Sequence, residues 1–249
     1  MSQSFDDFIA SLDIPEACYL DQKLYKKQFY ELAKMNRARQ EFFAKTVASV
    51  TWTHTLKKAT INIPPLVTDK LEYIEIAFIH VRLQEKAHMK KIAEVIHLIP
   101  YPVVLWMTYE SNLCVCTAQK YINQADSSKL TTDEYLYSEW IDLRSPTAEA
   151  SQFLQSLELK HLSFESFYHF YQDVCDLIVA FKASALGATF STADTSQKKQ
   201  ILDKIQVLEE QILSVRSAIK KELQFNAKVR FNMQVKELLA QVETLKNSL

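Results

Sequence analysis

EYIEIAFIHVRL, residues 72–83, is the segment with the clearest extended pattern in the chain. The odd-numbered residues from Glu75 to Leu83 share one face of an extended chain, and the even-numbered residues from Ile74 to Arg82 share the other. Apolar side chains occur on both faces. This pattern predicts an internal strand that is covered on both sides, as in a layered α/β domain.

Further strands and helices are predicted around this segment. β-branched and aromatic residues predict four more strands, over residues 51–56, 102–109, 113–120 and 135–143. Residues 60–63 are interpreted as a continuation of the first of these strands, and residues 85–99 as an amphipathic helix. We therefore expect an α/β (α+β) domain over residues 1–145, with a mixed sheet of about five strands.

Two residues near the N-terminus are predicted helix caps. Ser4 precedes apolar residues at helical spacing over residues 4–12, and Asn36 precedes a second such pattern that includes Phe42 and Phe43. Ser and Asn side chains accept hydrogen bonds from the free amides of a first helical turn. Both positions are therefore expected to start a helix.

After residue 145 the chain is predicted to be helical. Residues 146–190 form a helical extension, in which the apolar and aromatic stretch 163–186 must be buried. Residues 187–197 are the predicted linker. Residues 197–249 contain no glycine and no proline, and we expect them to form a long coiled-coil helix.

Two apolar seams run along this last segment, each stepping by four and three residues as coiled-coil a and d positions do. The first consists of Ile201, Ile205, Leu208, Ile212, Val215 and Ile219. The second consists of Phe231, Val235, Leu238, Val242, Leu245 and Leu249. The spacing from Ile219 to Phe231 puts the two seams out of phase. We expect one continuous helix that binds a protein partner or a second copy of the chain; a helical hairpin explains the offset equally well.

A single glycine, Gly187, occurs in the chain. Phosphate-binding loops need glycines for a close backbone approach and for positive φ, so nucleotide-dependent enzymes with such loops are set aside. The six histidines and four cysteines show no metal-ligand spacing. We therefore predict no cofactor, no metal and no catalytic residue.

Composition and the N-terminal sequence predict a soluble, cytoplasmic protein. Hydrophobic residues make up 48% of the chain and charged residues 24%, which is typical of a globular protein with a core. MSQSFDDFIASLD lacks a signal-peptide pattern, and the apolar stretches are too short to span a bilayer. The cysteine pattern fits a reducing compartment.

A basic segment with interleaved aromatic residues is a candidate nucleic-acid surface. Its cations are Lys23, Lys26, Lys27, Arg37 and Arg39. Such residues can follow a phosphate backbone while bases stack on the rings. Residues 1–60 hold nine Lys and Arg against seven Asp and Glu, so an ordinary solvated surface is the competing interpretation.

Glu72 and Glu75 are the candidates for a metal-dependent nuclease. Such a site needs two carboxylates for Mg²⁺ and a lysine on the adjoining strand. Ala77 and Arg82 break this pattern. A solvated carboxylate at a strand end is the competing interpretation.

Several segments resemble a bacterial family, domain-of-unknown-function family 4391. The resemblance is carried by residues 14–31, 50–65, 74–86 and 92–106, with the signatures TINIP (60–64), IPYP (99–102), EWIDL (139–143) and QFN (224–226). Members are typically encoded beside helicases, DNA methyltransferases and restriction-like ATPases, which implies a role in anti-phage defence. The resemblance supplies no catalytic motif.

These observations favour a non-catalytic accessory subunit of a restriction or anti-phage defence assembly. Its partner would be another copy or a protein such as a helicase or methyltransferase subunit, bound through the C-terminal helix. A nucleic-acid-binding module and a metal-dependent nuclease are the alternatives.

Overall fold

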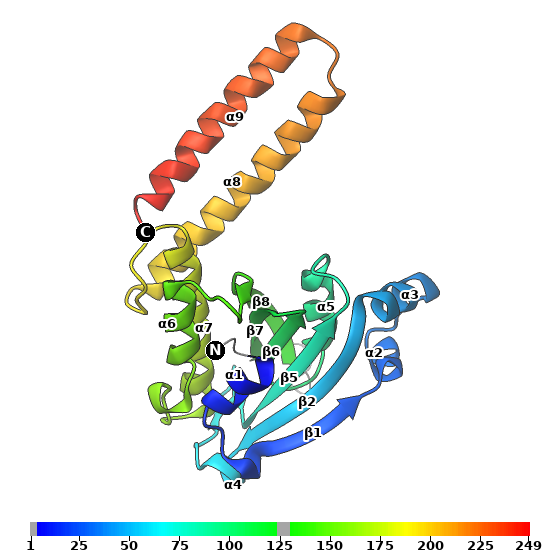
Figure 1. The fold of residues 1–249 in the computed structure, drawn as a ribbon, viewed down its shortest axis with the longest axis vertical. Helices are drawn as coiled ribbons and strands as arrows, with labels where there is room; N and C mark the ends of the chain where they lie inside the picture. The colour runs from blue at the N-terminus through cyan, green and yellow to red at the C-terminus, as the bar shows by residue number, and fades with distance from the viewer. Residues whose placement is uncertain (1–3, 124–129) are drawn as a thin grey trace. The chain divides into compact units, whose positions relative to one another are not determined.

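The computed structural model describes residues 4–123 and 130–249, and it divides into two units (Figure 1). Residues 1–178 form the first, which we call the sheet unit, and residues 179–249 form the second, the hairpin unit.

The sheet unit contains a mixed sheet of seven strands, in which β9 pairs with β7 beside the main order β1-β2-β5-β6-β7-β8. The strands are β1 (Tyr19–Leu24), β2 (Val47–Lys57), β5 (Glu75–Leu83), β6 (Val103–Tyr109), β7 (Asn112–Ile122), β8 (Leu130–Tyr137) and β9 (Ile141–Asp142). The neighbours β5 and β6 run parallel because α5 (Met89–Ile96) crosses over between them, and the other pairs are antiparallel. A separate two-stranded sheet pairs β3 (Leu66–Val67) with β4 (Glu72–Tyr73).

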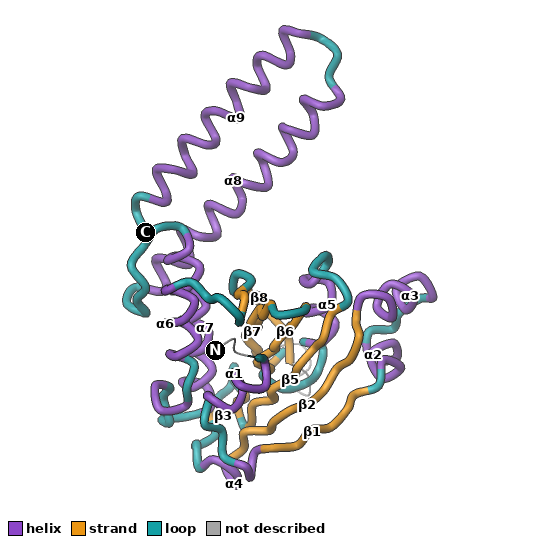
Figure 2. The backbone as a smooth tube through the Cα atoms, viewed as in Figure 1, coloured by secondary structure: helices purple, strands orange, loops and turns teal. Residues whose placement is uncertain are grey.

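The strand β5 is internal and covered on both faces, as its sequence predicts (Figure 2). On one face, Ala77, Ile79 and Val81 join a core with α5 and with residues of α2 (Lys26–Leu32) and α3 (Arg37–Thr46). On the other face, Phe78 meets Trp106, and Phe8 of α1 (Phe5–Ser11) contacts the same Trp106 ring. The two apolar faces of one strand therefore belong to two helical layers.

The helix α7 (Phe167–Ala185) is fixed to the sheet by a buried tyrosine. The hydroxyl of Tyr171 accepts from the Ala118 amide at 2.8 Å and donates toward the Val103 carbonyl at 2.9 Å. The remaining helices of this unit are α4 (Lys58–Ile61), α6 (Ala148–Ser156) and the 3-10 helices η1 (Glu16–Cys18) and η2 (Leu159–His161).

Both predicted helix caps are confirmed. The Ser4 hydroxyl accepts from the Asp7 amide at 3.1 Å, and the Asp7 carboxylate accepts from the Ser4 amide at 2.8 Å, which completes a capping box on α1. The Asn36 side chain accepts from the Arg39 amide at 3.0 Å and caps α3.

The sheet differs from the prediction in three places. It has seven strands rather than about five. The edge strand β1 is not predicted, because its side chains are mostly exposed and carry no apolar alternation, and the predicted strand 135–143 is divided between β8 and β9. Residues 60–63 do not continue β2, since α4 intervenes and Asn62 ends it in the left-handed region at φ 55°. The predicted strand 72–83 is split at Ile74 into β4 and β5.

The hairpin unit contains two antiparallel helices, α8 (Thr195–Lys221) and α9 (Phe225–Lys246), which lie side by side (Figures 1 and 2). The predicted single helix over 197–249 is therefore wrong. Residues 222–224 leave the helical conformation, and Glu222 adopts an extended backbone at φ −74° and ψ 139°. Folding back lets two out-of-phase seams cover each other, which a straight helix cannot do within one chain.

Candidate interaction surfaces

The predicted seam residues form one core inside the hairpin unit. Six of the residues in it are buried: Ile201, Ile205, Ile212, Val235, Leu238 and Val242. Partly buried residues pack against them, including Leu208, Val215, Ile219 and Leu245. All ten predicted partner-binding residues thus contact the same intramolecular core. A surface for a partner is better sought on the outer sides of α8 and α9.

A groove lies between α8 and α9, away from the turn. It encloses about 620 Å³ and is lined by Asp203, Lys204, Val207, Leu208, Gln241, Thr244 and Leu245. Asp203 and Lys204 balance each other in charge, and Val207 is exposed. The groove is therefore an apolar depression without an excess of either charge.

The turn between the helices and its flanks, residues 216–230, which we call the tip, expose large apolar side chains. Leu223 is 92% exposed and Phe225 is 76% exposed, and Val229 and Met233 follow on the outer side of α9. A contiguous group of exposed apolar side chains, unlike a single one, marks an interaction surface. Among the large hydrophobic residues of the described chain, Leu223 and Phe225 at the tip are the two most exposed.

The tip is held by the carboxylate of Glu222. It accepts from the Gln224 amide at 2.8 Å and from the Leu223 amide at 2.7 Å. These hydrogen bonds lower the pKa of Glu222, and the nearby cations Lys228 and Arg230 lower it further. The one acidic side chain of the tip is therefore engaged with the backbone of the turn.

Positive charge is concentrated at the tip. Residues 216–230 contain five cations, Arg216, Lys220, Lys221, Lys228 and Arg230, against one acid, Glu222. Residues 195–215 contain three cations and three acids, and residues 231–249 contain two of each. The tip thus carries a net charge of +4 while both stems are neutral.

The predicted basic segment is largely engaged within the sheet unit. The Lys26 ammonium is half-buried and donates to the carbonyls of Ala44 at 2.9 Å and Val47 at 2.5 Å, and burial lowers its pKa. Lys27 pairs with Glu31 at 3.9 Å, and Arg37 pairs with Glu41 at 2.9 Å. Lys23 is exposed on the edge strand β1.

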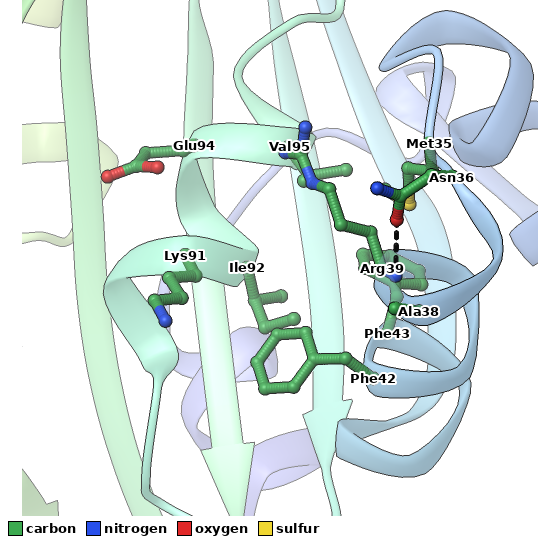
Figure 3. A pocket seen from close by; sticks show the side chains of 10 residues that line it. All are labelled: Met35, Asn36, Ala38, Arg39, Phe42, Phe43, Lys91, Ile92, Glu94 and Val95. Carbon is green, nitrogen blue, oxygen red and sulfur yellow. Dashed lines mark hydrogen bonds between the residues drawn. The ribbon is translucent and has the colours of Figure 1, made fainter.

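The fifth predicted cation, Arg39, lines a cavity between α3 and α5 (Figure 3). The cavity encloses about 490 Å³, with an apolar floor and a polar rim of Asn36, Arg39, Lys91 and Glu94. The Lys91 ammonium lies 5.8 Å from the centroid of the Phe42 ring. The rim cations are exposed, and Glu94 offsets part of their charge.

A buried lysine was not foreseen from the sequence. Lys120 on β7 is 2% exposed, and its ammonium donates to the carbonyls of His97 and Ile99 at the end of α5. Burial lowers its pKa to about 8, and burial beside Lys120 lowers the pKa of His97 to about 3. Because they are enclosed, Lys120 and His97 act as a structural support for α5. The only sequence signal for this contact is a lysine at the end of an apolar run.

Glu72 and Glu75 lie on different strands, β4 and β5. Within residues 4–123 and 130–249, no three His, Cys, Asp or Glu side chains are grouped so as to hold a metal ion. In the same described part of the chain, no helix has the length and apolarity needed to cross a membrane.

Comparison with known proteins assigns the chain to one protein family. The family model described as "Domain of unknown function (DUF4391)" matches residues 12–242. The chain belongs to this family. The match covers both the sheet unit and most of the hairpin unit, so the DUF4391 pattern includes the two helices and the turn between them. No curated protein and no solved structure matches the chain.

Proposed function

We propose that this DUF4391 protein is a non-catalytic accessory subunit that binds protein partners through its hairpin unit, within a bacterial restriction or anti-phage defence assembly. The observation that carries the proposal is the distribution of exposed apolar side chains. Seven of the fifteen exposed large hydrophobic residues of the described chain lie on α8, α9 and the turn between them. Exposed apolar surface of this density is typical of protein-binding sites.

The organisation of the hairpin unit supports the proposal. Its inner face is filled by its own seams, so the helices need no second chain to be covered. Its outer face remains available and is rich in apolar side chains. The defence assembly is inferred from the family resemblance, which implies helicase and methyltransferase subunits as candidate partners.

Nucleic-acid binding by the basic N-terminal segment is the weaker candidate. Of its five cations, Lys26 is bound to backbone carbonyls, and Lys27 and Arg37 are paired with acids. A phosphate backbone would have to compete with these contacts. A nuclease role for Glu72 and Glu75 is weaker still, because the two residues lie on different strands in different sheets.

Co-purification tests the accessory role. The full chain is tagged at its N-terminus and expressed in its native host, with Ile205→Asp and Ser214→Asp as a matched pair of variants on α8. Ile205 is buried in the inner seam, whereas Ser214 is exposed. We expect a stoichiometric protein partner with the wild type and Ser214→Asp, and none with Ile205→Asp. The proposal is overturned if Ile205→Asp retains the partner, or if the wild type purifies without one.

A further inference from the structure

An apolar stripe runs along the outer side of α9 beside the tip. Phe225, Val229 and Met233 are spaced by four residues and therefore lie on one side of the helix. They are 76%, 42% and 59% exposed. The buried Val235 lies about 200° around the helix from Met233, so the stripe faces away from the inner seam.

Cations border this stripe on both sides. Lys228 precedes Val229 and Arg230 follows it, so the two side chains leave the helix about 100° to either side of Val229. Among the described residues, neither cation has an acidic partner within ion-pair distance. The nearby carboxylate of Glu222 is held by the amides of the turn. The stripe is thus an apolar strip with positive edges.

The positive charge is local to this surface. Residues 216–230 carry a net charge of +4, whereas the two stems carry none. The groove on the stem offers apolar surface of its own, without this excess of charge. Charge therefore distinguishes the tip as the place where an acidic partner is attracted.

We propose that this surface, made of Phe225, Val229 and Met233 with Lys228 and Arg230 at its edges, docks an acidic amphipathic helix of a protein partner. The proposal rests on the accessory role and names the partner's chemistry. A helix with apolar residues at i and i+4 matches a stripe of the same spacing, and acidic residues beside them meet the two cations. Arg216, Lys220 and Lys221 extend the positive field around it.

The apolar side chains favour a protein over the other anionic partners. A nucleic-acid backbone presents phosphates but leaves Leu223, Val229 and Met233 uncovered, because only aromatic rings stack on bases. A membrane-surface helix needs an apolar face over many turns, whereas this stripe ends after two turns at Lys236, which lies on the same side of α9.

The test uses the full chain and a phage-displayed library of short random peptides as the probe. Enriched peptides are synthesised and titrated by fluorescence anisotropy against the wild type and two tip variants. One variant is Lys228→Glu with Arg230→Glu, and the other is Phe225→Ser with Met233→Ser. The matched control, Lys204→Glu with Lys246→Glu, makes the same change of charge on the stems.

We expect enriched peptides with apolar residues at helical spacing between acids, and at least about tenfold weaker binding to each tip variant. The stem control should bind like the wild type, and added salt should weaken binding. Circular dichroism checks that the helices persist in each variant. The variant Phe225→Ser with Met233→Ser keeps the cations near Glu222, so it tests the site even if the charge reversal unfolds the tip.

Several results would overturn the docking site. These are no enrichment, enriched peptides without acids, or equal binding to the tip variants. Tip-dependent binding to phosphatidylglycerol vesicles or to a DNA duplex in place of peptides also overturns it. If the native partner is lost in Ile205→Asp but retained in both tip variants, the docking site is wrong while the accessory role stands.

Discussion

In the sheet unit, the ammonium groups of Lys26 and Lys120 point at backbone carbonyls, whereas in the hairpin unit Lys228 and Arg230 flank exposed apolar side chains. The first two cations thus serve the fold, whereas Arg230 is exposed and Lys228 is partly exposed. The difference teaches that a cation count alone does not locate a binding surface. What locates it is the set of cations that the fold leaves without a structural role.

The largest expected effect separates the stability of the two units. Ile205→Asp places a carboxylate in the narrow hairpin core, which should cost more than about 4 kcal/mol and melt α8 and α9. The sheet unit should persist, because its core does not include Ile205. Hydrogen exchange should show fast amides over 195–246 and protected amides in β5 and β6.

All three tryptophans, Trp52, Trp106 and Trp140, lie in the sheet unit and give a second readout. Their fluorescence should stay native in Ile205→Asp while the helical circular dichroism falls. Ser214→Asp controls for a charge on the exposed side of α8. Equal loss of protection in both units would contradict their independence.

Acidification should weaken the sheet unit selectively. The pKa of His97 falls from 6.5 to about 3 because the ring is buried beside Lys120. The unfolded chain therefore binds a proton below pH 6.5 that the folded chain refuses. The free energy of unfolding therefore has its full value above that pH. It decreases as the pH falls toward about 3, by about 2 kcal/mol between pH 7 and pH 5.

Urea unfolding followed by tryptophan fluorescence measures this loss. His80 acts in the same direction, since burial lowers its pKa to about 4. The His97→Asn variant should show a shallower pH dependence than the wild type. An identical pH dependence would remove His97 from the explanation.

Two neighbouring lysines sharpen the comparison within the sheet unit. Lys26→Met removes the donor to the Ala44 and Val47 carbonyls and should cost about 1–3 kcal/mol. Lys27→Met removes an exposed pair with Glu31 and should stay within about 0.5 kcal/mol. Chemical denaturation of both variants measures the difference, and equal costs would show that Lys26 has no structural role.

The smallest expected effect is at the tip. Glu222→Gln weakens the two hydrogen bonds from the turn amides and should slightly lower the melting temperature of the hairpin unit only. Because the pKa of Glu222 is lowered in the folded state, its contribution is present at neutral pH and lost on acidification. Thermal melts of the wild type and the variant, followed by circular dichroism at 222 nm, measure this difference. A higher melting temperature for the variant at neutral pH would contradict the role of Glu222.

The parts of the fold that the sequence predicts are those with a strong local period. The two apolar faces of residues 75–83 indicate an internal strand, and Ser4 and Asn36 indicate helix starts. The strand β1 is missing from the prediction because an exposed edge strand needs no apolar alternation.

The candidate site is harder to predict because it depends on which contacts are already made. The seams over 201–219 and 231–249 are correctly located, yet their spacing does not reveal whether they meet within one chain. The turn at 222–224 contains neither glycine nor proline, and Glu222 replaces them by capping the turn with its carboxylate. The exposed stripe beside it becomes visible only once the inner face is assigned.

Pulsed electron paramagnetic resonance between nitroxide labels at Lys204 and Gln241 tests the central claim most directly. In the hairpin these residues line one groove, so we expect a single short distance that persists when labelled chains are diluted with unlabelled ones. In a continuous helix the same residues lie about 55 Å apart. A distance near that value, or a short distance that disappears on dilution, would contradict a hairpin whose seams are filled within one chain.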